Sequence, residues 1–329
     1  MNINPLEYTD KSYFITEIEV NPSWAKDLGP DYKAYRERWK NATTNFHLYD
    51  FPRCLEVESS YACNFTCPNC PRFAATNVPK KGDLSDEMFN LLFQECKKER
   101  LDSIFLDHGG EPLMNKQFPE IVAKAHDAGI LDIMFSTNAS LLTKDISAKV
   151  IANGVTKINF SIDAASPETY AVTRPGGEYH RVIGNIDNFL EEKAKRGKSY
   201  PRTRVSFIVQ DSNRHEVDKF FEIWAPKVNM VAFQSRKDFS RILSTDFIEK
   251  PDVEFRCTQI FSILMIDHMG NIHICNHDYN HNYILGNLRT HSVKECWHSD
   301  IMKRFQDIHR QGRWDIIDFC KHCVAGAVK

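Results

Sequence analysis

At residues 63–70 the chain reads Cys63-Asn-Phe-Thr-Cys67-Pro-Asn-Cys70, directly after a strand-like run, Arg53-Cys-Leu-Glu-Val-Glu58. Three thiolates this close together can hold an iron–sulfur cluster from one loop, because soft sulfur ligands suit iron. No fourth cysteine follows at short range, so one iron would keep an open coordination position, and chemistry takes place at open positions. A zinc knuckle would need a fourth Cys or His nearby, and the next histidine, His108, is far along the chain.

The composition is that of an ordinary globular protein. The chain has 329 residues, 42% of them hydrophobic and 26% charged, which allows one large domain or one large and one small domain. The formal net charge of −2 does not indicate the basic surface that nucleic-acid binding requires. The start, Met1-Asn-Ile-Asn-Pro-Leu-Glu, does not resemble a signal peptide, and the longest apolar run, residues 260–266, is too short for a membrane span. We therefore expect a cytoplasmic protein without a membrane or nucleic-acid partner, whose ten cysteines are metal ligands or buried residues rather than disulfides.

Strand-like and helix-like segments alternate from residue 53 to residue 234, which predicts a parallel βα architecture. The expected strands are 54–58, 103–107, 132–136, 157–163, 204–210 and 229–234, and the expected helices are 85–98, 118–128, 144–153, 181–195 and 214–224. Six such units are too few for a closed barrel of eight. They are compatible with a doubly wound sheet or with an open partial barrel.

Polar motifs lie where these strands end, and ligands collect at the carboxyl ends of parallel strands. Asp107-His-Gly-Gly-Glu-Pro112 ends the second strand, and its glycines would let the backbone approach a ligand closely. Phe135-Ser-Thr-Asn138 ends the third strand. In Asn159-Phe-Ser-Ile-Asp163, the alternation places Ser161 and Asp163 on one side of the fourth strand. Arg174 could bind a carboxylate through its guanidinium group, although a surface arginine beside a turn is nearly as good an interpretation.

The cysteine triplet and the downstream Gly-Gly-Glu resemble the radical S-adenosylmethionine (SAM) superfamily. That resemblance implies a six-unit partial TIM barrel and a [4Fe–4S] cluster on Cys63, Cys67 and Cys70, with the amino and carboxylate groups of SAM on the fourth iron. The residues expected to contact SAM are Gly109, Gly110, Glu111, Ser136, Thr137, Asn138, Ser161, Asp163 and Arg174. Many relatives have an aromatic residue before the third cysteine, where this chain has Asn69.

A second set of cysteines follows the barrel, at Cys257, Cys275, Cys320 and Cys323. Four ligands complete a metal site, and both zinc and [4Fe–4S] fit this count. The surrounding sequence, a predicted hairpin over 266–275 with a Gly-Asn turn and a helix over 301–310, resembles the twitch domain, a shortened relative of the SPASM domain. The resemblance implies an auxiliary [4Fe–4S] cluster with no vacant iron, whose expected role is electron transfer.

The resemblance leaves two reactions open. Radical dehydrogenation of an alcohol needs a base and an electron acceptor, whereas radical epimerisation needs a hydrogen donor, usually a cysteine thiol. Asp278 is our first choice for the base, ahead of Arg236 and Arg241, and Cys296 and Cys54 are the candidate donors, although buried structural cysteine is the better interpretation of both. His273, His277 and His281 recur at four-residue spacing, for which we expect surface or substrate-contact roles rather than metal binding.

The sequence thus predicts an α/β protein with three parts: an N-terminal extension (1–50), a partial (β/α)6 TIM barrel (51–235), and a lid or linker with a small α+β cluster-binding domain (236–329). The expected cofactors are SAM and two [4Fe–4S] clusters, and the expected reductant is a flavodoxin or ferredoxin. A sugar or aminocyclitol is the preferred substrate, and a ribosomal peptide is the second possibility. The non-enzymatic alternative is a zinc-stabilised binding scaffold.

Overall fold

The computed structural model describes residues 15–73, 81–236, 257–278, 281–321 and 323. In these ranges one ten-stranded sheet runs through the molecule in the order β1-β7-β6-β5-β4-β3-β2-β8-β9-β10. The strands are β1 (Ile15–Glu19), β2 (Cys54–Val57), β3 (Ser103–Phe105), β4 (Asp132–Thr137), β5 (Lys157–Ser161), β6 (Arg202–Val209), β7 (Met230–Ser235), β8 (Ile263–Ile266), β9 (Asn271–His273) and β10 (Ile284–Asn287).

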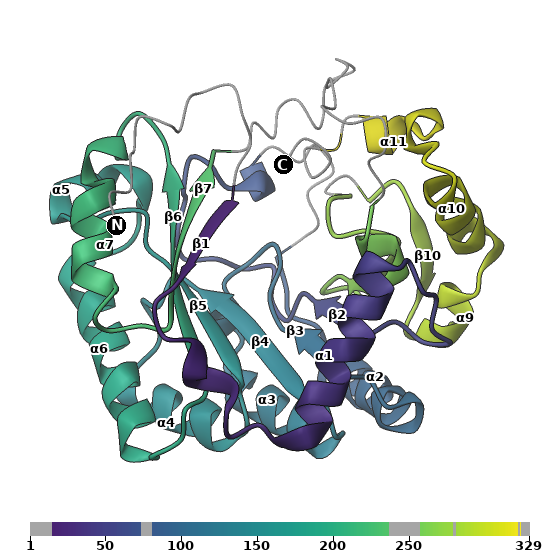
Figure 1. Cartoon of the computed structure of the whole chain (residues 1–329), viewed down its shortest axis with the longest axis horizontal. Coiled ribbons are helices and arrows are strands. Elements are labelled where there is room, and N and C mark those ends of the chain that lie inside the picture. The colour runs from purple at the N-terminus through teal and green to yellow at the C-terminus, as the bar shows by residue number, and fades with distance from the viewer. Residues whose placement is uncertain (1–14, 74–80, 237–256, 279–280, 322, 324–329) are drawn as a thin grey trace.

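The six strands from β2 to β7 are parallel to one another and follow the chain order. Helices cover their outer face (Figure 1): α2 (Asp86–Glu99), α3 (Phe118–Asp127), α4 (Lys144–Ala152), α5 (Pro167–Thr173), α6 (Tyr179–Lys195) and α7 (Val217–Trp224). The predicted partial (β/α)6 barrel is therefore confirmed, and the six predicted strands are observed with small shifts at their ends. The doubly wound alternative is excluded because the strand order from β2 to β7 follows the sequence without the reversal that defines a doubly wound sheet.

The barrel strands alternate between an apolar outer face and a polar inner face. In β2, Leu55 and Val57 join the hydrophobic core beneath the helices, whereas Cys54 and Glu56 point to the inside. Helices α2, α3 and α4 begin within one residue of their predicted starts, whereas α6 begins two residues earlier, α7 begins three residues later, and α5 was not predicted. The Ser85 side chain caps α2 by accepting a hydrogen bond from Met88 N. The polar inner face leaves room for ligands at the carboxyl ends of the strands.

The N-terminal segment closes one edge and one end of the barrel. Strand β1 pairs antiparallel with β7. Helix α1 (Gly29–Thr44) lies across the amino ends of the strands, where the hydroxyl groups of Tyr32 and Tyr35 donate to Asp132 Oδ2 over 3.1 and 3.0 Å. These two tyrosines therefore pack the helix against the barrel.

The C-terminal segment continues the same sheet. Strand β8 pairs parallel with β2, and β9 and β10 follow antiparallel. The predicted hairpin is confirmed, with Gly270 in the left-handed region (φ +81°) at its turn. Helices α9 (Val293–Trp297), α10 (Asp300–Arg310) and α11 (Asp318–Lys321) complete this α+β unit.

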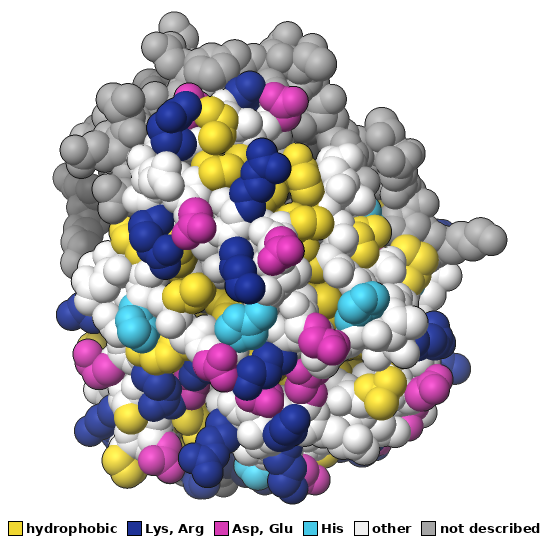
Figure 2. All heavy atoms as spheres, turned by 90° about the vertical axis from the view of Figure 1, so that its right-hand side faces the viewer, with side chains coloured by type: hydrophobic (Ala, Val, Ile, Leu, Met, Phe, Trp, Pro, Cys, Tyr) yellow, Lys and Arg dark blue, Asp and Glu magenta, His cyan; other side chains and the backbone are white. Residues whose placement is uncertain are grey.

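The face on the side of α9 and α10 intersperses basic and acidic side chains and has no continuous block of one charge (Figure 2). Among the described helices, none combines the length and the apolar character that crossing a bilayer requires.

Candidate active site

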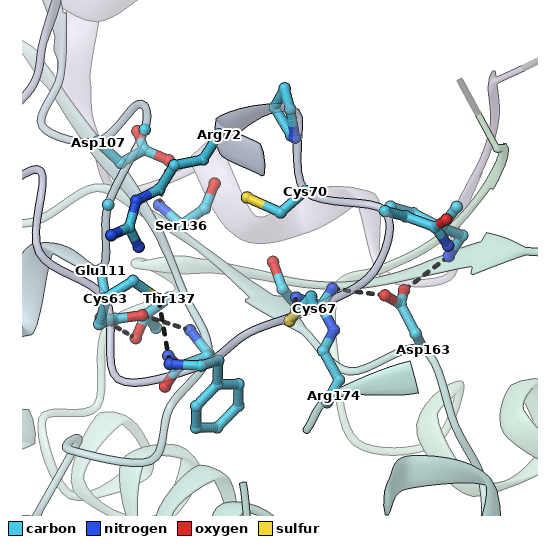
Figure 3. Close-up of a pocket in the computed structure, with 18 of the residues that line it drawn as sticks. Cys63, Cys67, Cys70, Arg72, Asp107, Glu111, Ser136, Thr137, Asp163 and Arg174 are labelled. Atoms are coloured by element: carbon cyan, nitrogen blue, oxygen red, sulfur yellow. Dashed lines mark hydrogen bonds and ion pairs between the residues drawn. The ribbon is translucent and has the colours of Figure 1, made fainter. Parts of the chain in front are cut away.

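A cavity of about 250 Å³ opens at the carboxyl ends of the barrel strands (Figure 3). Its walls include the three cysteines of the triplet and all nine residues that the sequence predicts to contact SAM. These are Cys63, Cys67, Cys70, Gly109, Gly110, Glu111, Ser136, Thr137, Asn138, Ser161, Asp163 and Arg174. Residues from four strand ends thus meet around one space, as expected for a parallel barrel.

The cysteine loop is held against its neighbours by close backbone contacts. A methyl group on Gly110 would lie 2.0 Å from Ser60 O and 2.7 Å from Ala62 O, so only glycine fits there. On the other side, Thr66 N donates to Pro175 O over 3.0 Å. These contacts hold the cysteine loop between the Gly-Gly-Glu segment, which follows β3, and residues 174–177, which follow helix α5.

Glu111 connects two walls of the cavity. Its carboxylate accepts hydrogen bonds from Thr137 Oγ1 and Asn138 N, both at 2.7 Å, and from Leu113 N at 3.2 Å. Burial raises the pKa of Glu111 to about 7, although these hydrogen bonds act in the opposite direction. The side chain therefore fixes the loop after β3 to the end of β4.

Arg174 faces the sulfur atoms. Its guanidinium forms an ion pair with Asp163 Oδ2 at 2.6 Å, and its Nη1 lies 3.7 Å from Cys67 Sγ. Burial raises the pKa of Asp163, while Arg174 opposes that shift. Arg174 Nε is buried without a hydrogen-bond partner, so the group has a donor left for an anionic ligand.

These residues fit the cluster and the cofactor that the triplet implies. Burial raises the pKa of the Cys63 and Cys70 thiols, and the neighbouring cysteine sulfurs add to this effect. A buried set of mutually repelling thiolates is stabilised by a bound cation, and soft sulfur donors select iron or zinc. Arg174, with its free donor, is suited to a carboxylate such as that of SAM.

The four cysteines of the second set, Cys257, Cys275, Cys320 and Cys323, lie close enough for their charges to affect one another. Burial raises the pKa of Cys275 well above its ordinary value, and the charges of Cys257, Cys323 and Cys320 raise it further. His309, on α10, joins two of these positions: its Nδ1 accepts from Cys257 N at 3.3 Å, and its Nε2 lies 3.4 Å from Cys320 Sγ. Four sulfurs with such a supporting histidine fit a closed metal site.

Hydrogen bonds connect the cavity with the second set. His108, in the cavity wall, places Nδ1 2.8 Å from Glu56 Oε1. The other oxygen of Glu56 accepts from Asn276 Nδ2 at 2.6 Å, and Asn276 directly follows Cys275. Sequence reasoning missed these contacts and that of His309, because they join residues far apart in the chain.

The three residues predicted as base or hydrogen donor lie outside the cavity wall. Both carboxylate oxygens of Asp278 serve its own loop, accepting from Tyr283 N at 2.7 Å and Asn282 Nδ2 at 3.1 Å. Cys54 is fully buried at the first residue of β2, the end of the strand away from the cavity, and burial raises its pKa to about 12. Cys296 lies on the buried face of α9, and a methyl group on Gly286 of β10 would lie 2.8 Å from its sulfur. Arg236 is exposed, and Arg241 lies outside the described residues.

Two of the three spaced histidines do not lie at the surface. His273 and His277 are buried, so a surface position is wrong for both. His273 Nε2 is 3.0 Å from Asp267 Oδ2, and His281 Nδ1 is 3.5 Å from the same oxygen. The strand alternation that directs His273 inward, and the buried turn that holds Asp267, explain the difference.

Comparisons with known proteins agree with this geometry. Residues 57–222 match the model of the radical SAM superfamily, and residues 257–324 match SPASM, an iron–sulfur cluster-binding domain. The mycofactocin maturase MftC of Mycolicibacterium smegmatis is 28% identical over 52% of this chain and 41% of its own length. The AdoMet-dependent heme synthase of Methanosarcina barkeri is 30% identical over 55% of this chain and 49% of its own. The chain thus spans about half the length of the curated relatives it matches.

Solved structures share the fold. BtrN in complex with AdoMet and 2-DOIA superposes with a TM-score of 0.57 at 17% identity, covering 83% of this chain and 93% of BtrN. Streptococcus suis SuiB bound to precursor peptide SuiA gives a TM-score of 0.56 at 15% identity, covering 84% of this chain and 72% of SuiB. The chain therefore belongs to the radical SAM superfamily, and its cofactors are SAM and [4Fe–4S] clusters that include an auxiliary one.

Proposed function

We propose that this protein dehydrogenates a carbinol carbon of a polar small molecule. The observation that carries the proposal is the placement of the cysteines, all ten of which lie within the described residues. Seven belong to the two ligand sets, and the other three, Cys54, Cys96 and Cys296, are buried and do not line the cavity. An epimerase of the expected kind would need one of them beside its substrate, whereas a dehydrogenase needs none.

The chemistry divides between the bound groups and the chain. When bound, SAM on its reduced cluster supplies a 5′-deoxyadenosyl radical that removes hydrogen from carbon, and the auxiliary cluster supplies an electron acceptor. Cys63, Cys67 and Cys70 would hold the first cluster, and Cys257, Cys275, Cys320 and Cys323 the second. Arg174 would orient the SAM carboxylate, and the hydrogen bonds of Glu111 would hold the cavity wall in place. The expected source of electrons for the first cluster is a flavodoxin or ferredoxin.

We favour a sugar or aminocyclitol as the substrate. The likeness to BtrN, whose structure contains 2-DOIA, covers nearly the whole of that chain, so both proteins have the same compact arrangement of barrel and cluster domain. A peptide is the second candidate, supported by SuiB, which was solved with its precursor peptide, and by the mycofactocin maturases. Their greater length leaves parts of each relative that this chain does not match.

Turnover in deuterated water tests the reaction. The cluster-loaded protein is mixed with SAM, a strong reductant and candidate sugars, aminocyclitols or peptides, and the products are analysed by mass spectrometry. We expect a product that has lost two hydrogens, formed together with 5′-deoxyadenosine. A product of unchanged mass in light water that gains one deuterium at carbon in heavy water would instead show epimerisation and overturn the proposal.

A further inference from the structure

The carboxylate of Asp107 lines the cavity. Asp107 follows β3 by two residues, so the strand alternation directs it to the inner face of the barrel, beside Ser136 at the end of β4. One oxygen, Oδ2, accepts a hydrogen bond from Ser136 N at 2.9 Å. The Ser136 side chain is a second hydrogen-bond partner of this carboxylate, so among the described residues Ser136 supplies the hydrogen bonds that hold it. A carboxylate that lines a cavity and is held in place by one neighbouring residue is suited to accept a proton there.

Charged groups surround Asp107 on several sides. Glu56 faces it from β2, and His108 and Glu111 lie in its own loop. Arg72, on the short helix Pro71–Phe73, lines the same cavity. Burial raises the pKa of Asp107 to about 7, and the charge of Glu56 raises it further, while His108 opposes the shift. A base with a pKa near neutrality is well matched to proton transfer at physiological pH.

His108 does not compete for this role. Burial lowers its pKa, but the hydrogen bond to Glu56 and the surrounding carboxylates outweigh that effect and raise the pKa to about 9. The imidazole is therefore protonated at neutral pH and cannot accept a second proton. Asp278 is also unavailable, because its two oxygens are occupied within its own loop.

We propose that Asp107 is the catalytic base that accepts the substrate hydroxyl proton, and that Glu56 and His108 position and tune it. This inference rests on the proposed dehydrogenation. After a hydrogen atom has left the carbinol carbon, the O–H bond breaks and its proton goes to the carboxylate of Asp107. One electron goes to an acceptor of the iron–sulfur class, and the carbon–oxygen double bond forms. A hydroxyl on a radical carbon is far more acidic than an alcohol, so a carboxylate is a sufficient base.

The test compares D107N with a matched charge-removing variant, D145N, on the exposed surface of α4. Both full-length, cluster-loaded proteins receive a substrate carrying deuterium at the carbinol carbon. In D107N we expect deuterium still to enter 5′-deoxyadenosine, while the oxidised product falls at least about 100-fold. In D145N both should remain at the wild-type level. Equilibrium dialysis of SAM, which does not depend on turnover, should give the same affinity for all three proteins.

A second variant distinguishes loss of the base from misfolding, because D107N could lose activity for either reason. E56Q keeps the Asp107 carboxylate but removes both the neighbouring negative charge and the carboxylate that pairs with His108, so the acid limb of the pH–rate profile should shift. A purely structural role of Asp107 would not move it. Wild-type oxidation rates in D107N, or an unmoved profile in E56Q, would overturn the role of Asp107 while leaving dehydrogenation intact. A wild-type enzyme that epimerises its substrate would overturn both.

Discussion

Replacing Gly110 with alanine should separate the loop after β3 from the cysteine loop. The new methyl group would lie 2.0 Å from Ser60 O and 2.7 Å from Ala62 O, both backbone atoms that cannot rotate away. Since such contacts are essentially never shorter than 3.0 Å, the two loops must move apart by about 1 Å (3.0 − 2.0). Overpacking of this kind costs about 1–3 kcal/mol, and a clash between two backbones belongs at the upper end.

Gly184 provides the matched control. It lies within α6, and no atom comes within 4 Å of the added methyl group. Alanine is the better helix former, so G184A should gain about 1 kcal/mol. The two substitutions are chemically the same and should therefore differ in stability by about 4 kcal/mol, with opposite signs.

Two measurements check this expectation. Urea unfolding followed by tryptophan fluorescence should place the midpoint of G110A below that of the wild type and the midpoint of G184A above it. Equilibrium dialysis should show SAM affinity reduced at least about tenfold in G110A only, because both displaced loops line the cavity. A G110A protein with the wild-type midpoint and the wild-type affinity would refute the packing argument.

Two further predictions concern His309 and Glu111. In H309A, loss of the contacts to Cys257 and Cys320 should weaken the auxiliary site, so that iron after reconstitution falls from about eight towards about four atoms per chain; unchanged iron would count against this role. In the wild type, Glu111 holds its proton up to about pH 7 when folded but only to about 4.5 when unfolded, so its contribution to stability falls as pH rises between these values. In E111Q that component is absent, and the urea midpoint should fall less between pH 5 and 7; equal slopes would contradict the cause assigned to the shift.

The barrel could be predicted because its signals are local and repeated. Each of the six parallel strands has an apolar face, and helix starts such as Ser85 carry capping residues. Strand β1 was missed because it is a half-exposed edge strand, Ile15–Glu19, whose partner β7 lies more than two hundred residues later. Nothing within the segment itself indicates that pairing, so only the folded chain shows it.

The site was predictable to the same extent. The cysteine spacing and the motifs at strand ends identified the cavity wall, because parallel strands bring their carboxyl ends together. Asp107 stood at the start of a quoted motif, and the alternation that directs Glu56 inward could have marked it as well. Asn276 and His309 gave no such signal, since their importance arises from partners on other elements.

Strand β2 forms backbone hydrogen bonds with β3 on one side and β8 on the other. The cysteine triplet follows β2, and Cys275 follows the hairpin that begins with β8. The pairing of β2 with β8 therefore fixes the distance between the two cysteine sites. Two domains joined by a flexible linker can move apart. The barrel and the C-terminal unit cannot do so without breaking the backbone hydrogen bonds between β2 and β8. A one-residue slip of β8 would turn Met265 and Asp267 to the opposite side and carry the second site out of alignment. A change in the register of these paired strands would therefore change the spacing between the two cysteine sites.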